Sequence, residues 1–192
     1  MKNIVLIGGG GHCKSVIDVI EQDGSFKIVG IVDNSKQSSF NIFGYPVIGD
    51  DSDLISLAKK YQYALVTVGQ IQSPALRIKL FNLAVEAGFQ IPNIISPNAY
   101  VSKHAIIGNG TVVMHNALVN ASTIIGRNCI INTSALIEHD SSVGDHCHIA
   151  TKAVVNGGVN IGQGSFIGSG SITKEGISIS DHSFIKAGDV VK

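Results

Sequence analysis

An aliphatic residue recurs every six positions from Val101 to Val191, and Thr173 is the one exception in that series. Four residues after each of these positions lies a second series, in which the side chains are small almost throughout. No helix has a six-residue period, and a flat strand alternates every two residues. The pattern therefore predicts the hexapeptide repeats of a parallel β-helix. The aliphatic positions are Val101, Ile107, Val113, Val119, Ile125, Ile131, Ile137, Val143, Ile149, Val155, Ile161, Ile167, Ile179, Ile185 and Val191.

A longer period overlies the repeat, because a glycine follows the aliphatic position at Gly108, Gly126, Gly144 and Gly162. Three repeats in each longer period imply three faces per coil. We therefore expect a triangular prism of roughly five coils, with neighbouring strands about 4.8 Å apart. Each short strand would place one aliphatic side chain in the interior, and the small residue would let the chain turn the corner. A single repeat cannot bury its apolar face alone, so the coils are expected to be stable only when stacked.

The residues before the repeats have a different pattern, in which strands and helices alternate. An apolar run at 3–8, a four-glycine stretch, a helical apolar face at 15–21 and an apolar run at 27–32 predict a βαβ unit with a parallel sheet. Pro97 marks the change to the six-residue pattern. We therefore expect an α/β domain over 1–96 and the β-helix over 97–192. Within the α/β domain the pattern also predicts a polar turn at 35–40, helices at 51–60 and 73–88, and strands at 63–68 and 89–95.

Composition and charge exclude several classes of function. The chain has 192 residues, and its 14 basic and 14 acidic side chains give a formal net charge of zero. The sequence has neither the dense basic runs of a nucleic-acid-binding protein nor an apolar run long enough to span a membrane. Its three cysteines argue against a disulfide framework, and its first residues lack the long apolar stretch of a secretion signal. We therefore expect a cytoplasmic protein with no nucleic-acid or membrane partner.

The four-glycine stretch is the first candidate site. Gly8, Gly10 and Cys13 occupy the glycine places of the dinucleotide-binding G-x-G-x-x-G motif, so the third glycine is absent. Bare backbone N–H groups at a helix N-terminus still attract phosphate. Asp33 ends the second strand, where dinucleotide folds keep an acid for a ribose hydroxyl. A mononucleotide, as in a nucleotide-sugar, fits this small domain better than NAD does, and a tight turn with no ligand is the alternative.

The second candidate site is the run NTSALIEHD at residues 132–140. His139 lies two places after the wall residue Ile137, close to a predicted corner. An imidazole titrates near neutral pH and can be oriented by a neighbouring acid, so His139 is a candidate general base. The sequence leaves open whether Asp140 or Glu138 contacts the ring, because adjacent residues of a strand point to opposite sides. A solvated surface histidine is the alternative.

Histidines and cysteines in the repeats raise the alternative of a metal site. A zinc centre like that of the β-helical carbonic anhydrases needs three histidines that meet at one point. The spacings do not obviously converge, so no metal is expected. Cys129 and Cys147 belong to the small series and are interpreted as wall residues, and Cys13 is not expected to be a nucleophile. The histidines considered are His104, His115, His139, His146 and His148.

Three features together resemble the sialic acid O-acetyltransferase-like family of sugar acetyltransferases. They are the stretch from Gly8 to His12 that opens an α/β domain, the pair Asp33-Asn34, and the run at 132–140 within hexapeptide repeats. That family includes the bacterial nucleotide-sugar 4-amino N-acetyltransferases of the bacillosamine and legionaminic acid pathways. The resemblance covers nearly the whole chain. It implies a Rossmann-like N-terminal domain followed by a left-handed parallel β-helix, and a homotrimer with each active site between two subunits.

The resemblance also implies roles for individual residues. His139 matches the catalytic base, Asp140 its partner acid, and Asn132 a polar residue close to the acceptor. The positions that match those holding the nucleotide-sugar are Gly10, Gly11, His12, Asp33, Asn34 and Gly69. The positions that match those lining the acetyl-CoA groove are His148, Gly157, Gly168, Ser169 and Ala187. Relatives continue into a tail with a Gly-x-Pro-Ala-Lys-like segment, whereas this sequence ends at Lys192, so we expect part of that groove to be altered or borrowed.

The resulting prediction is an acetyl-CoA-dependent N-acetyltransferase that acts on the 4-amino group of a nucleotide-linked amino-dideoxy sugar. Transfer would be direct, with His139 as general base and no covalent acyl-enzyme. An O-acetyltransferase of a sialic-acid-like sugar is the first alternative. A non-catalytic, sugar-binding trimer is a weaker alternative, because the Glu138-His139-Asp140 cluster counts against it.

Overall fold

The computed structural model of the chain describes residues 1–34 and 41–192 and divides into two compact units. The first unit comprises Met1–Gly69 and Ala75–Pro92, and the second comprises Gln70–Pro74 and Asn93–Lys192. The division therefore falls slightly before residue 96, and a short segment from the middle of the first predicted domain belongs to the second unit. The polar turn predicted at 35–40 lies outside the described residues.

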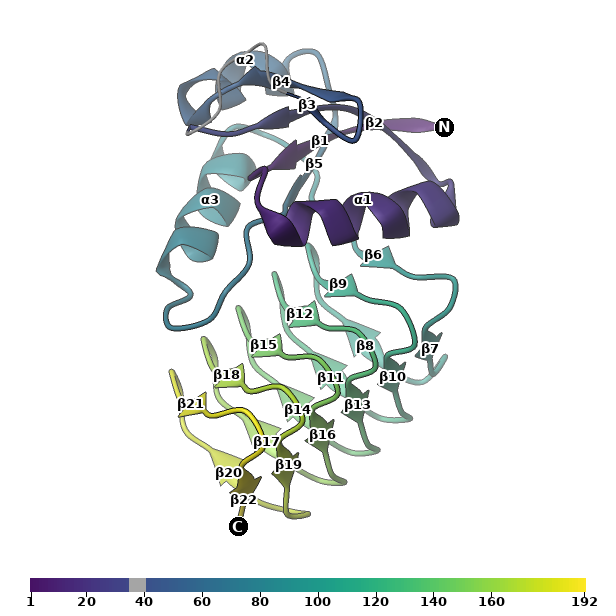
Figure 1. The fold of residues 1–192 in the computed structure, drawn as a ribbon, viewed down its shortest axis with the longest axis vertical. Coiled ribbons are helices and arrows are strands. Elements are labelled where there is room, and N and C mark those ends of the chain that lie inside the picture. The colour runs from purple at the N-terminus through teal and green to yellow at the C-terminus, as the bar shows by residue number, and fades with distance from the viewer. Residues whose placement is uncertain (35–40) are drawn as a thin grey trace. The chain divides into compact units, whose positions relative to one another are not determined.

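The first unit is built on five strands: β1 (Lys2–Ile7), β2 (Phe26–Val32), β3 (Asn41–Ile42), β4 (Tyr45–Gly49) and β5 (Tyr63–Val66). They form one sheet in the order β3-β4-β2-β1-β5, which Figure 1 shows. β1 pairs in parallel with β2 and β5, and β2 with β4, whereas β3 and β4 are antiparallel. The parallel strands confirm the expected Rossmann-like fold. The β3–β4 pair is an addition that the hydrophobic pattern did not predict.

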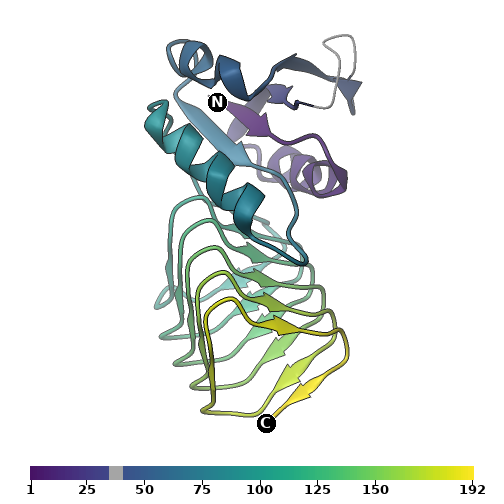
Figure 2. The same ribbon diagram turned by 90° about the vertical axis from the view of Figure 1, so that its left-hand side faces the viewer.

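Helices cover both faces of this sheet, as expected for parallel strands. They are α1 (Gly11–Asp23), the 3-10 turn η1 (Asp51–Asp53), α2 (Leu54–Ala58) and α3 (Ala75–Glu86). Val5 and Ile7 of β1 form one buried cluster with residues of α2 and α3. Ile4 and Leu6 alternate with them and are equally buried. α1 packs against β2, and Figure 2 shows α1 and α3 on opposite sides of the sheet. No helix in the described ranges is both long and apolar enough to cross a membrane.

The single strand predicted at 89–95 is wrong. Gln90 forms a lone bridge with Tyr63 in the first unit, whereas β6 (Ile94–Ile95) pairs with a strand of the second unit. Pro92 lies between them, and a proline has no N–H to continue a ladder of hydrogen bonds. The end of the α/β unit and the start of the repeats are therefore separate elements.

The second unit is a left-handed parallel β-helix with three faces, and Figure 2 shows its coils stacked one on another. The first face contains β6, β9 (Val112–Val113), β12 (Ile130–Ile131), β15 (His148–Ile149), β18 (Phe166–Ile167) and β21 (Phe184–Ile185). The second face contains β7 (Tyr100–Val101), β10 (Leu118–Val119), β13 (Leu136–Ile137), β16 (Val154–Val155), β19 (Ile172–Thr173) and β22 (Val190–Val191). The third face contains β8 (Ile106–Ile107), β11 (Ile124–Ile125), β14 (Ser142–Val143), β17 (Asn160–Ile161) and β20 (Ser178–Ile179).

The aliphatic series fills the interior of the prism, as predicted. Ile131, Ile149 and Ile167 are fully buried in one cluster, which also contains the small wall residues Cys129 and Cys147. The exception, Thr173, is buried as well. Its hydroxyl oxygen accepts a hydrogen bond of 3.0 Å from the backbone N–H of Asn156, so the polar atom is satisfied inside the wall.

Candidate functional site

The predicted site residues of the second unit lie at two corners of the prism and on its first face. His139, Asp140 and Gly157 lie at the corner between the second and third faces, which we call the base corner. The remaining residues lie at the corner between the first and second faces, or on the first face itself, and we call that corner the amide corner. Both corners border the second face. At the amide corner are Asn132, Gly168, Ser169 and Ala187, and His148 is on the first face.

His139 and Asp140 are the two turn residues of the base corner, and their side chains contact each other. The Nδ1 atom of His139 lies 2.8 Å from Oδ2 of Asp140. Both side chains are largely exposed, and the Nε2 atom of His139 has no hydrogen-bond partner among residues 1–34 and 41–192. The hydrogen bond to Asp140 raises the pKa of His139 above its ordinary value of 6.5. The ring is thus held at one nitrogen and available at the other, as a general base requires.

The contact identifies Asp140, and not Glu138, as the acid that orients the ring. Glu138 follows β13, and its Oε2 atom accepts hydrogen bonds from Nδ2 of Asn120 at 2.7 Å and from the backbone N–H of His139 at 3.3 Å. Through these two hydrogen bonds, Glu138 links the base corner to the neighbouring coil, which contains Asn120. Asn120 is a residue of this cluster that the sequence analysis missed, although it lies eighteen residues before Glu138.

Gly157 lies next to the imidazole in the following coil. A Cβ atom on Gly157 would be 3.0 Å from Cε1 and 3.1 Å from Nε2 of His139. Almost any side chain here would therefore push against the free edge of the ring. The glycine leaves Nε2 accessible, and a predicted coenzyme residue thus lies directly beside the predicted base.

Asn132 and His148, which were expected to serve different substrates, are hydrogen-bonded to each other. The Nδ2 atom of Asn132 lies 3.0 Å from Nε2 of His148. On its other side, Nδ1 of His148 lies 2.6 Å from the backbone carbonyl oxygen of Gln70. His148 is 8% exposed and packs edge-on against Phe166. The partner Gln70 was not anticipated, because it is 78 residues away in the chain.

The other predicted coenzyme residues form a compact group near the end of the amide corner. A Cβ atom on Gly168 would lie 2.5 Å from the backbone nitrogen of Ala187, so these two residues are in close contact across adjacent coils. Ser169 accepts a backbone hydrogen bond of 3.0 Å from Gly188. Both Ser169 and Ala187 are exposed.

The glycine stretch of the first unit is held by two polar side chains. Oδ2 of Asp33 accepts a 2.6 Å hydrogen bond from the backbone N–H of Gly9, and the hydroxyl of Thr67 donates one of 2.6 Å to the carbonyl of Gly8. Gly8 has a φ of 105°, and a Cβ on it would lie 2.3 Å from Val68. Asp33 thus shapes the loop in addition to facing the pocket, and Thr67 was not predicted.

The helix N-terminus that follows is open. α1 begins after Gly10 without a side-chain cap, and its first turn carries no acidic residue. A Cβ on Gly10 or Gly11 would meet nothing within 4 Å. Unsatisfied backbone N–H groups at such an end, together with the helix dipole, favour an anion. Lys14 lies one turn further along α1 and lines the pocket that Gly11 also lines.

A pocket of about 320 Å³ in the first unit contains most of the residues predicted to hold the nucleotide. Gly10, Asp33, Asn34 and Gly69 line it, together with apolar residues of α3. Asn34 is fixed by two hydrogen bonds with Asp51, one from its Nδ2 to the carboxylate at 2.8 Å and one from the Asp51 backbone to its Oδ1 at 2.9 Å. His12 is not among the lining residues. Its Cβ lies 3.6 Å from where Gly69 would carry one.

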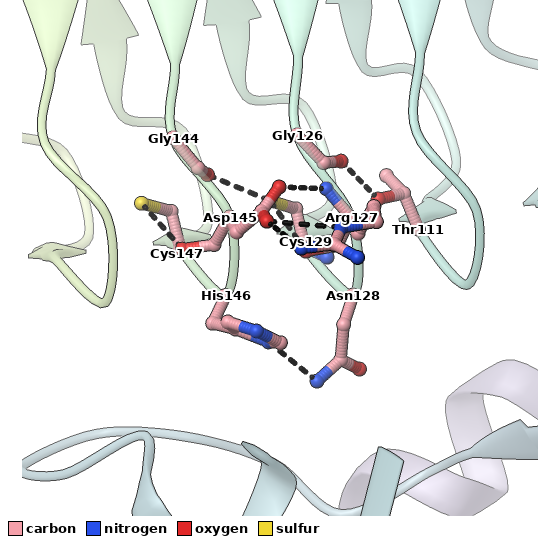
Figure 3. Close-up of polar contacts among 9 residues, drawn as sticks. All are labelled: Thr111, Gly126, Arg127, Asn128, Cys129, Gly144, Asp145, His146 and Cys147. Carbon is pink, nitrogen blue, oxygen red and sulfur yellow. Dashed lines mark hydrogen bonds and ion pairs between the residues drawn. The ribbon is translucent and has the colours of Figure 1, made fainter. Parts of the chain in front are cut away.

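The corner between the third and first faces carries a separate polar cluster, shown in Figure 3. Nε and Nη2 of Arg127 both donate to Oδ2 of Asp145 in the next coil, at 3.0 and 2.6 Å. Nδ2 of Asn128 lies 3.0 Å from Nδ1 of His146. This corner does not border the second face. Among the described residues, no group of three or more His, Cys, Asp or Glu side chains is arranged to hold a metal ion.

Comparison with known proteins gives two family matches. Residues 3–83 match the family described as the PglD N-terminal domain. Residues 122–157 match the bacterial transferase hexapeptide of six repeats. The two matches fall on the α/β unit and on the middle of the prism.

Solved structures resemble the chain over its full length. The acetyltransferase domain of PglB from Neisseria gonorrhoeae gives a TM-score of 0.92 at 32% identity, over 100% of this chain and 92% of that chain. The same domain with acetyl coenzyme A gives 0.91 at 31% identity, over 99% and 92%. A mutant of perosamine N-acetyltransferase from Caulobacter crescentus, in complex with CoA and GDP-perosamine, gives 0.93 at 34% identity, over 100% and 89%.

A curated sequence relative is an uncharacterized protein of Acanthamoeba polyphaga mimivirus. It is 36% identical over 112 residues, which is 57% of this chain. The match spans only about a fifth of that protein's length, since it covers 21% of it.

Proposed function

Because this chain belongs to the family of hexapeptide-repeat sugar acetyltransferases with a PglD-type N-terminal domain, we propose that it transfers the acetyl group of acetyl-CoA to the 4-amino group of a nucleotide-linked amino-dideoxy sugar. The single observation that carries the proposal is the 2.8 Å contact of His139 with Asp140, beside a glycine that leaves Nε2 accessible. The printed ligands of similar structures, acetyl coenzyme A in one and GDP-perosamine with CoA in another, support it.

The proposed chemistry is a direct transfer. Asp140 accepts the Nδ1–H of His139, so Nε2 carries the lone pair and takes a proton from the sugar amine as the amine attacks the thioester carbon. The tetrahedral intermediate places negative charge on the carbonyl oxygen, for which a backbone N–H of a neighbouring coil or subunit is the expected donor. Collapse breaks the carbon–sulfur bond, and the proton held by His139 is available to the departing thiolate. The products are the N-acetylated sugar and CoA.

The nucleotide part of the acceptor is assigned to the first unit. The open N-terminus of α1 suits a pyrophosphate, and Asp33 and Asn34 line the adjoining pocket at the end of β2, where ribose hydroxyls are bound in related folds. A free sugar acid would have little use for these features. The glycine stretch therefore favours a nucleotide-linked acceptor over a sialic-acid-like one.

We also propose a homotrimer. The outward residues of the second face form an apolar column, and Tyr100 and Val190 at its ends are 60% and 62% exposed. An apolar column of this kind is commonly covered by another chain, and closed rotational symmetry is the usual arrangement of identical chains. The remaining members of the column are Leu118, Leu136, Val154 and Ile172. Sedimentation equilibrium tests this proposal, and a monomer at micromolar concentration would contradict it.

The activity is tested by release of free thiol from acetyl-CoA with a panel of acceptors. The panel contains UDP- and GDP-linked 4-amino-4,6-dideoxy sugars, and free sialic and legionaminic acids. Turnover of one nucleotide-linked amino sugar, with the acetyl group found on nitrogen by mass spectrometry and NMR, supports the proposal. Turnover of the free acids alone would replace it with O-acetylation. Thiol release without any acceptor, together with a stable acetyl-enzyme, would contradict direct transfer.

A further inference from the structure

His148 is held between two groups that fix the position of its proton. Its Nδ1 faces the backbone carbonyl oxygen of Gln70 at 2.6 Å, and a carbonyl oxygen can only accept. Nδ1 must therefore carry the hydrogen. In the neutral ring this leaves Nε2 as an acceptor, and its neighbour is the amide of Asn132 at 3.0 Å. The hydrogen-bond network thus assigns the Nδ1–H tautomer to His148.

The same network determines which way the Asn132 amide points. An acceptor at Nε2 of His148 requires the NH₂ end of the amide on that side. At the other end, Oδ1 of Asn132 accepts a 2.8 Å hydrogen bond from the backbone N–H of Thr133. Two independent contacts therefore agree on one orientation. One Nδ2 hydrogen of Asn132 remains without a partner in the described part of the chain, on a half-buried residue of the amide corner.

Gln70 is itself firmly placed. Gln70 is 3% exposed. It is the first residue of the segment Gln70–Pro74, which belongs to the second unit. The preceding strand end is fixed within the first unit, where the buried guanidinium of Arg77 donates to the carbonyls of Val66 and Val68 at 3.3 and 2.5 Å. At the far end of the segment, Pro74 packs 3.3 Å from where Gly164 would carry a Cβ. The carbonyl that orients His148 is thus part of a well-anchored connection.

We infer that Gln70 is a positioning residue. Through His148 its backbone carbonyl fixes Asn132 as a hydrogen-bond donor toward an oxygen of a substrate. The inference rests on the proposed acetyltransferase function and makes it more specific. The substrate atom that meets Asn132 has to be an acceptor, either the thioester carbonyl of acetyl-CoA or a hydroxyl oxygen of the sugar. An ammonium group, which can only donate, is excluded from this position.

The proton positions can be tested on the wild-type protein without any substrate. We expect ¹⁵N-labelled histidine spectra of the full chain, assigned with His148→Gln, to show a protonated Nδ1 and an unprotonated Nε2 for His148 at neutral pH. A His148 ring protonated only at Nε2 would overturn the inference, because Nδ1 would then have no hydrogen for the Gln70 carbonyl. A doubly protonated ring would overturn it too.

The role of Asn132 is tested by Asn132→Asp, which keeps the shape and replaces the donor with a carboxylate oxygen. That oxygen favours a charged His148 ring, so the Nε2 signal should become that of a protonated nitrogen. We expect kcat/KM to fall about 10- to 100-fold, the effect of losing one strong hydrogen bond. The matched control is Asn128→Asp. It makes the same change in the Asn128–His146 pair at the corner between the third and first faces (Figure 3) and should leave kcat/KM at the wild-type level.

Two further readouts separate the possible substrates and the possible failures. A rise in the KM of acetyl-CoA alone assigns the acceptor oxygen to the thioester, and a rise in the KM of the sugar alone assigns it to the sugar. An Asn132→Asp enzyme with wild-type kcat/KM would overturn the inference while the proposed function stands. If the wild-type protein turns over no acceptor of the panel, the proposed function fails, and the His148 spectrum still decides the tautomer.

Discussion

His139 and Asp140 are consecutive in the chain, and yet Nδ1 of one lies 2.8 Å from Oδ2 of the other. Consecutive residues of an extended strand point to opposite sides. Here the contact is possible because both residues form the turn at a corner, and Asp140 has a left-handed backbone with a φ of 59°. Gly158, one coil on, has the same conformation with a φ of 69°. The backbone geometry that turns the coil thus also brings the imidazole of His139 and the carboxylate of Asp140 together.

Removal of the base should abolish most of the activity and leave the fold intact. We expect His139→Ala to lower kcat by roughly 10²–10⁴, the usual contribution of a general base. His139 is exposed, so the circular dichroism spectrum and the thermal midpoint should not change. The control is His104→Ala, an exposed histidine two coils earlier at the same corner of the prism, which should retain full activity. Near wild-type turnover by His139→Ala would remove His139 from this role.

The pH dependence of the reaction should report the His139–Asp140 contact. The ring must be neutral to accept a proton, and the hydrogen bond to Asp140 raises its pKa above 6.5. Activity should therefore be lost as the pH falls through that raised value. In Asp140→Asn the charge is removed, so the acidic limb of kcat/KM should move to lower pH. The plateau should fall about tenfold or more because the tautomer is no longer held. An unchanged limb would show that another group titrates.

The glycines that follow the aliphatic residue of the third face, Gly108, Gly126, Gly144 and Gly162, pack closely against the next coil, so a larger side chain there should lower stability. A Cβ at Gly126 would lie 2.6 Å from the backbone nitrogen of Asp145 and 2.7 Å from the carbonyl carbon of Gly144. Because two of the three nearest atoms are backbone atoms, the coils would have to separate. We expect Gly126→Ala to lower the free energy of unfolding by about 1–3 kcal/mol, measured in urea. Gly11→Ala, whose Cβ would meet nothing within 4 Å, is the control and should unfold like the wild type.

The three cysteines should be unreactive in the folded protein. Cys13, Cys129 and Cys147 are all buried and free of disulfides. Burial raises the pKa of Cys13 to about 11, and a hydrogen bond with Cys129 together with burial raises the pKa of Cys147. Since the thiolate is the reactive form, a thiol reagent should label none of them until denaturant is added. Rapid labelling of the native protein would contradict the expected lack of reactivity, and an acetylated cysteine after incubation with acetyl-CoA would contradict direct transfer to the sugar.

The prism could be predicted because its six-residue repeat is visible directly in the sequence. Every sixth residue faces the interior, so the wall could be assigned from the sequence, and even Thr173 lies where the period places it. The boundary between the α/β unit and the prism was harder to predict from the sequence. The apolar residues at 89–95 suit a strand, but Pro92 divides them between two sheets, and no periodicity reveals to which sheet each half belongs.

The residues of the site could be nominated, but their contacts could not all be predicted. The choice between Glu138 and Asp140 depends on the positive φ of Asp140, which the alternation of side chains along an extended strand does not predict. The partnership of Gln70 with His148 joins positions 78 residues apart, and neither residue type signals it. Contacts between adjacent coils, such as Asn120 with Glu138, could have been found by comparing residues eighteen positions apart.

The stacking of two-residue strands has a consequence for how distances along the prism can change. Leu118, Leu136 and Val154 pair in direct succession, so each set of eighteen residues advances the chain by one strand spacing of about 4.8 Å. Inserting or deleting a complete coil would shift Gly157 or Ala187 relative to His139 by one such step and keep every wall residue inside. A change of six or twelve residues would move everything that follows to another face, and a change that is not a multiple of six would turn corner residues into the core. The distance along the prism axis between His139 and the residues that would meet the far end of a long ligand can therefore be altered only in steps of one coil.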